Sequence, residues 1–110
     1  NMIVTENKFG YIKLTDDVLK KFDVDAATAG NMVNNFNYIE DFVSWAVFTE
    51  DKNNDFIRGS IRSRGPIIND VAAKFGGGGH KLASGVRLKN FEEVDKLVEA
   101  LDLECNKYES

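Results

Sequence analysis

Cysteine, histidine and proline are almost absent from this chain, which has one of each in 110 residues. A single cysteine excludes an internal disulfide and fits a reducing, cytoplasmic setting, and we expect Cys105 to be a small apolar residue of the core. One histidine and one distant cysteine leave no ligand set for zinc. Long hydrophobic runs are also missing, so neither a membrane span nor a signal peptide is expected.

The usual sequence motifs of nucleotide-binding loops and hydrolases are missing too, although four consecutive glycines are present. A Walker A loop needs glycine directly before its lysine and Ser or Thr after it, but His80 and Leu82 occupy those positions. No G-x-G-x-x-G register fits, because Lys81 or Leu82 falls where the last glycine belongs. No G-x-S-x-G elbow is found, although the many hydroxyls and acids leave a Ser-His-acid triad open.

The hydrophobic pattern predicts a single compact α/β domain over residues 1–110, with a mixed sheet of about four strands flanked by helices. Strands are predicted at 9–14, 42–49, 56–62 and 83–88. Helices are predicted at 16–22, 26–35, 66–75 and 91–101, with Thr15, Asp25 and Asn90 as caps and Pro66 in the first turn of the third helix. The element order is therefore βααββαβα. The segment 42–49 is almost continuously apolar, which is typical of a strand buried on both faces.

The net charge of −4 conceals one basic segment. Seven basic residues and one acid lie between positions 58 and 89, whereas the rest of the chain has seven basic and seventeen acidic residues. The basic residues of this segment are Arg58, Arg62, Arg64, Lys74, Lys81, Arg87 and Lys89. An acidic protein with one basic segment suits a small anionic ligand better than a long nucleic acid duplex.

The glycine run, residues 76–79, allows two interpretations. Glycine loses more conformational freedom on folding than any other residue, so four in a row need a structural reason. One interpretation is a tight turn between a helix and a strand. The other is an anion site in which backbone N–H groups, the His80 ring and the Lys81 ammonium converge on one phosphate.

Two arginines precede this run by one short helix. Strand alternation places Ser60, Arg62 and Arg64 on one side of their strand and Ile61 on the other, towards the core. Arg62 and Arg64 can then present planar guanidinium groups to phosphate oxygens, with Ser63 adding a hydroxyl. The competing interpretation is an ordinary solvated strand face.

Three segments together resemble the signature of the DHH-associated C-terminal domain of DHH-family phosphoesterases. They are Ser60-Ile61-Arg62-Ser63, then Asn69-Asp70-Val71-Ala72, then the pattern G-G-G-H-x-x-A-x-G within 75–85. The resemblance covers most of the chain. Within the superfamily the sequence is most similar to oligoribonucleases that degrade nanoRNA and dephosphorylate 3′-phosphoadenosine 5′-phosphate, and cyclic di-AMP phosphodiesterases are close relatives.

The resemblance implies a division of labour between two domains of one chain. A separate N-terminal catalytic domain carries the Asp-His-His motif and a manganese pair, while the C-terminal domain binds the substrate. Carried over to this sequence, the substrate contacts are Arg62, Ser63, Gly77, Gly78, Gly79 and His80, with Arg64 and Lys81 as secondary contacts. No catalytic residue, metal ligand or cofactor is expected in this chain, which resembles the substrate-binding part of a longer cytoplasmic hydrolase.

The expected ligand is a short RNA or a nucleotide, and the sequence does not choose among nanoRNA, 3′-phosphoadenosine 5′-phosphate and a cyclic dinucleotide. A second hypothesis is a stand-alone RNA- or tRNA-binding module, because similar domains are appended to alanyl-tRNA synthetases. The acidic overall charge argues against that hypothesis. We therefore expect the isolated chain to bind nucleotides without hydrolysing them.

Overall fold

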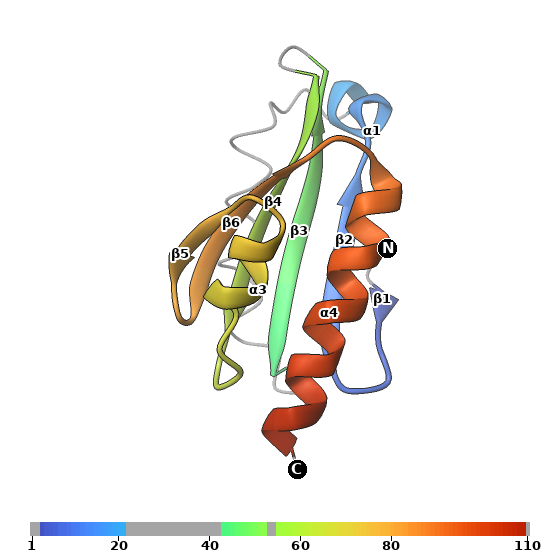
Figure 1. Cartoon of the computed structure of the whole chain (residues 1–110). Coiled ribbons are helices and arrows are strands. Elements are labelled where there is room, and N and C mark those ends of the chain that lie inside the picture. The colour runs from blue at the N-terminus through green and yellow to red at the C-terminus, as the bar shows by residue number, and fades with distance from the viewer. Residues whose placement is uncertain (1–2, 22–42, 53–54, 110) are drawn as a thin grey trace.

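The computed structural model describes residues 3–21, 43–52 and 55–109, which form one mixed β-sheet and three helices. Six strands lie in the order β1-β2-β3-β4-β6-β5 (Figure 1). β2 and β3 run parallel, and the other neighbouring pairs are antiparallel. The strands are β1 (Ile3–Val4), β2 (Phe9–Leu14), β3 (Ser44–Asp51), β4 (Phe56–Ser63), β5 (Gly78–His80) and β6 (Ala83–Leu88). The helices are α1 (Asp16–Lys21), α3 (Asn69–Lys74) and α4 (Phe91–Glu109).

The hydrophobic core lies between one face of the sheet and helices α3 and α4, which cover that face side by side (Figure 1). β3 supplies its centre, because Ala46 and Phe48 are fully buried there. Trp45 and Val47 point to the opposite face and are also buried, with 1% exposure or less. The predicted strand with two buried faces is therefore confirmed.

Helix α4 packs through the apolar stripe that its sequence predicts. The buried residues of this stripe are Val94, Leu97, Val98, Leu101 and Cys105. The Asn90 side chain caps the helix, since its Oδ1 accepts the backbone N–H of Glu93 at 3.0 Å. The helix continues eight residues beyond the predicted end at 101, to Glu109, and so brings Cys105 into the core as expected.

The strands at β2, β4 and β6 and the short helix α1 also lie where the sequence predicts them. The Thr15 hydroxyl accepts the N–H of Val18 at 3.4 Å, which supports its capping role. The predicted helix at 26–35 falls outside the described residues. No helix in the described part of the chain is long and apolar enough to cross a membrane.

Two predictions of the fold need correction. The sheet has six strands instead of about four, because β1 and β5 form its two edges. β5 consists of two glycines and His80, a composition that gives no strand signal by itself. The third predicted helix starts at Asn69, not at Pro66, because the Ile68 N–H donates to the carbonyl of Lys81 at 2.9 Å and holds the preceding residues outside the helix.

Candidate functional site

Strand β4 presents alternate side chains to the core and to the opposite face of the sheet. Ile61 is fully buried in the core, whereas Ser60 and Arg62 are half-buried on the other side. Arg64 follows the end of the strand, and its guanidinium carbon lies 5.1 Å from the ring centroid of Trp45. Trp45 is the residue opposite Arg62 in β3, so Arg64 shares the face of Arg62. The predicted common face of Ser60, Arg62 and Arg64 is confirmed.

Ser63 lies on the core side of the strand, away from Arg62. The residue is 9% exposed, and its hydroxyl donates to the carbonyl of Pro66 at 2.6 Å. The same oxygen accepts the N–H of Gly65 at 3.2 Å, while the backbone N–H of Ser63 donates to Leu82 at 2.9 Å. These bonds tie the end of β4 to the turn before β6. The structure thus gives Ser63 a connecting role, and its contact with substrate stays a prediction.

The glycine run divides into a helix end and an edge strand. Gly76 has a φ of 83° and follows Phe75, the C-cap residue of α3, and its N–H donates to the carbonyl of Ala73 at 3.1 Å. The N–H of Gly77 donates to Ala72 at 2.9 Å, so these two backbone donors are used by the helix. The predicted turn that ends the helix is therefore confirmed. Gly78 and Gly79 continue into β5, where alternate backbone groups of an edge strand face outwards.

Gly77 is needed because the chain passes very close to β6. A Cβ atom at this position would lie 2.1 Å from the carbonyl oxygen of Gly85 and 2.9 Å from the Cα of Val86. Both contacts are to backbone atoms, which cannot rotate away. At Gly78, in contrast, a Cβ would meet nothing within 4 Å. Close packing thus explains why residue 77 is glycine, whereas packing does not require glycine at position 78.

The strand register places His80 and Arg62 in one row across the sheet. His80 pairs with Ala83, Ala83 pairs with Arg62, and Arg62 pairs with Trp45. Paired residues project to the same face, so only the small side chain of Ala83 separates His80 from Arg62. Two strand spacings correspond to about 10 Å between their backbones. The structure therefore brings His80 near Arg62 and Arg64, which lie sixteen or more positions before it in the sequence.

Lys81 lies in the two-residue connection between β5 and β6, next to this row. It is exposed, and its carbonyl is held by the N–H of Ile68. His80 is exposed as well, with its carbonyl accepting the Ser84 hydroxyl at 2.8 Å. Arg62 uses one of its five donors on the Ile61 carbonyl at 2.9 Å. These hydrogen bonds hold the β5–β6 connection and the Arg62 side chain in place.

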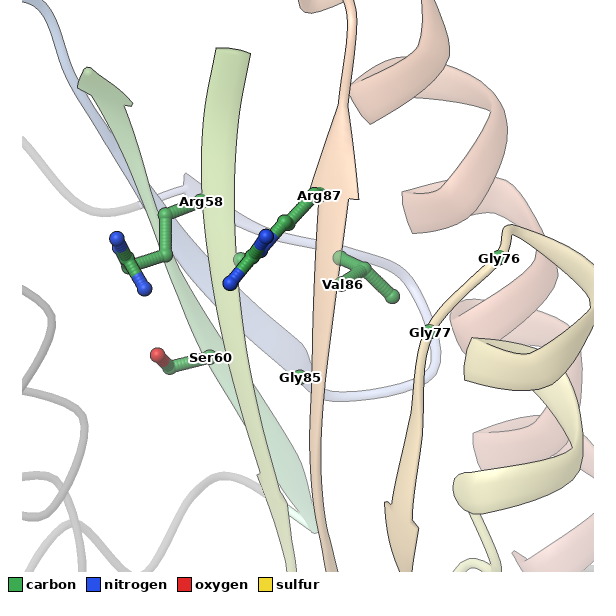
Figure 2. A pocket seen from close by; sticks show the side chains of 8 residues that line it. Arg58, Ser60, Gly76, Gly77, Gly85, Val86 and Arg87 are labelled. Carbon is green, nitrogen blue, oxygen red and sulfur yellow. The ribbon is translucent and has the colours of Figure 1, made fainter. Parts of the chain in front are cut away.

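A pocket of about 390 Å³ opens on the same face, one step along the strands. Arg58 and Ser60 of β4, Gly85 and Arg87 of β6 and the backbone of 76–77 line it (Figure 2). Sequence reasoning gave neither Arg58 nor Arg87 a role, although both belong to the basic segment. Alternation along β4 places Arg58 on the same face as Arg62, so the sequence already contained the signal for including Arg58.

The charged side chains described on this face are mainly basic. Asp51 pairs with Arg58, with 3.6 Å between its Oδ2 and the Nη2 of Arg58. No group of three or more His, Cys, Asp or Glu residues able to hold a metal lies within the described part of the chain. The arrangement can bind and orient an anion through guanidinium, imidazole and hydroxyl groups. It offers no ligand set for a manganese pair.

Comparisons with known proteins show similarity over nearly the whole chain. The bifunctional oligoribonuclease and PAP phosphatase NrnA of Bacillus subtilis is 35% identical over 109 residues, covering 99% of this chain and 34% of that protein. An exopolyphosphatase-related protein from Bacteroides fragilis has a similar structure, with a TM-score of 0.76 and 31% identity over 98% of this chain and 32% of that one. The chain spans about a third of the length of the curated relatives it matches.

The fold is also shared outside the phosphoesterases. The C-Ala domain of the Aquifex aeolicus alanyl-tRNA synthetase aligns with 96% of this chain and 97% of its own length, at a TM-score of 0.57 and 15% identity. At that identity the likeness concerns the fold alone. The model of the DHHA1 domain, however, matches residues 7–107. This chain therefore belongs to the DHHA1 domain family.

Proposed function

We propose that this chain is the substrate-binding domain of a phosphoesterase that acts on short oligoribonucleotides or phosphorylated nucleotides. In this proposal Arg62 and His80 hold one phosphate, with Arg64 and Lys81 beside it. The chemical step belongs to a separate catalytic domain of the parent protein. The proposal draws on the family membership and on the similarity to NrnA over nearly the whole chain.

The single observation that carries the proposal is the row His80–Ala83–Arg62. It joins the two side chains best suited to a phosphate on one face, although eighteen positions separate them in the sequence. Ala83 between them has a small side chain, which leaves space for a phosphate to contact both His80 and Arg62. A guanidinium forms paired charge-assisted bonds to phosphate oxygens, and an imidazole adds a donor.

The test is a nucleotide titration of this chain followed by NMR. AMP and adenylates of two or three residues are expected to shift the amide signals of 62–64 and 78–81 at millimolar ligand. Trp45 gives a second readout, because it is the only tryptophan and the Arg64 guanidinium lies 5.1 Å from its ring. Shifts confined to other regions, or none at millimolar concentration, would contradict the proposal.

Three variants distinguish a specific phosphate contact from a general effect of positive charge on AMP affinity. Arg62→Lys keeps the charge but loses the bidentate geometry, so AMP affinity is expected to fall about tenfold or more. His80→Ala removes an exposed ring and should weaken AMP in the same direction without lowering Tm. Lys96→Gln, on an exposed position of α4, is the matched control and should change nothing. Equal effects of Arg62→Lys and Lys96→Gln would remove Arg62 from the site.

A titration that compares a trinucleotide with a tRNA distinguishes this proposal from the alternative of a stand-alone RNA-binding module. A substrate-binding domain for short ligands gains little from a long duplex, since its basic face is small and the net charge is −4. A tRNA that binds far more tightly than a trinucleotide, with a steep salt dependence, would favour a module like the C-Ala domain.

A further inference from the structure

Arg58 and Arg87 form a like-charged pair that the sheet brings together. They are direct partners in the antiparallel register of β4 and β6, and both project to the face opposite the core, as Figure 2 shows. Like charges directly opposite each other in a sheet are destabilising. An anion bound between the two guanidinium groups would relieve this repulsion.

The described residues supply part of the counter-charge. Asp51 lies 3.6 Å from Arg58, and within the described residues no ion pair is formed by Arg87. The Nε of Arg58 is buried and has no hydrogen-bond partner. Arg87, which is exposed, thus keeps its guanidinium donors available to an anion, whereas the buried Nε of Arg58 is out of reach of a ligand.

The Phe56 ring supports both guanidinium groups. Its centroid lies 5.3 Å from the guanidinium carbon of Arg58 and 5.1 Å from that of Arg87. Contacts of this kind attract the cations to the ring and restrict their rotamers. The two arginines are therefore held in advance at one end of the pocket, which lowers the entropy cost of binding an anion.

Glycines create the room beside them. Gly85 is exposed in β6 and forms the floor of the pocket between Ser60 and the backbone of 76–77. Because no side chain stands there, the volume of about 390 Å³ stays open to solvent (Figure 2). The Ser60 hydroxyl faces the same side as the arginines and adds a neutral hydrogen-bonding group.

We propose that Arg58, Arg87 and Ser60 form a second phosphate subsite, which takes the phosphate of the nucleotide next to the one held at Arg62 and His80. This inference rests on the proposed function and extends it to the length of the ligand. Ser60 and Arg58 precede Arg62 by two and four residues on the same strand face, so the second subsite begins about 7 Å from Arg62 along β4 and extends to about 13 Å. A ligand with one phosphate reaches one position, whereas a dinucleotide or longer RNA with two or more phosphates reaches both.

The experiment compares two ligands on this chain. AMP carries one phosphate, and the 5′-phosphorylated diadenylate carries a second one in its linkage. Wild-type protein should bind the diadenylate at least about tenfold more tightly, the order expected of one charge-assisted contact. A diadenylate with a neutral methylphosphonate linkage should lose that advantage.

Two independent variants test the pocket itself. Arg87→Gln should reduce the diadenylate advantage to about twofold or less and leave AMP affinity unchanged. Gly85→Val should do the same by filling the floor, since a Cβ at Gly85 would lie 3.5 Å from the nearest atom, the Gly59 carbonyl oxygen, an ordinary contact. Lys96→Gln is the matched loss of one charge and should preserve the advantage. Thermal unfolding verifies that each variant is folded.

The outcomes separate this inference from the proposed function. Equal weakening of AMP and diadenylate by Arg87→Gln, or the same effect from Lys96→Gln, would overturn the second subsite. A diadenylate advantage that survives both Arg87→Gln and Gly85→Val would overturn it as well. AMP binding that is indifferent to Arg62→Lys would instead overturn the first site, whatever Arg87→Gln does.

Discussion

The glycine run offers a stability prediction whose size follows from single positions. Replacing Gly77 by alanine places a methyl group 2.1 Å from a backbone oxygen of β6 and 2.9 Å from a backbone carbon. Strand β6 or the end of α3 must move, and overpacking of this kind costs about 1–3 kcal/mol. For a domain of this size about 4 °C of Tm corresponds to each kcal/mol, so Tm should fall by about 4–12 °C.

Gly78→Ala is the matched control one residue later. It adds the same methyl group to an exposed position with no atom within 4 Å and no positive φ. Its free energy of unfolding should stay within about 0.5 kcal/mol of the wild type. Gly76→Ala is intermediate, because a φ of 83° costs a side chain about 1 kcal/mol although the space is open.

Urea unfolding and thermal unfolding of the three variants measure these differences. The reasoning would be refuted if Gly77→Ala were as stable as Gly78→Ala, because the close approach to β6 would then not exist. Nucleotide titration of Gly78→Ala adds a functional result. Weaker AMP binding at unchanged stability would show that the open backbone of β5 serves the ligand and not the packing.

Two further predictions concern the whole chain. Asp102 accepts bonds from the Thr5 hydroxyl, from the Asn7 N–H at 3.1 Å and from the Asn7 side chain at 2.9 Å, so it ties the β1–β2 connection to α4. Asp102→Ala should lower the free energy of unfolding by about 1–3 kcal/mol in urea titrations, with AMP affinity at 25 °C unchanged; a loss of affinity would connect this end of the sheet to the site. The isolated chain should hydrolyse neither a nitrophenyl-phosphate ester nor a dinucleotide when Mn²⁺ is added, because its described residues offer no carboxylate–imidazole cluster; metal-dependent turnover would contradict this.

Local patterns in the sequence were sufficient for the elements with strong periodicity. The continuous apolar run of β3 reflects burial on both faces, and the stripe of α4 reflects burial that repeats about every 3.6 residues. Neighbouring residues alone reveal both patterns. Alternation along β4 likewise predicted that Ser60, Arg62 and Arg64 share a face. The same alternation places Ser63 on the core side, so its proximity to Arg62 in the sequence did not bring its side chain near Arg62 in space.

The tertiary structure decided the features that depend on pairing between distant segments. Gly78 and Gly79 carry no strand propensity, and they form an edge strand because β6 pairs with them and α3 holds Gly76 and Gly77. The row from His80 to Arg62 and the pair Arg58–Arg87 depend on the register of three strands. Side-chain direction alternates within each strand, so the local sequence predicts it. Strand register depends on contacts between segments that only the folded chain brings together.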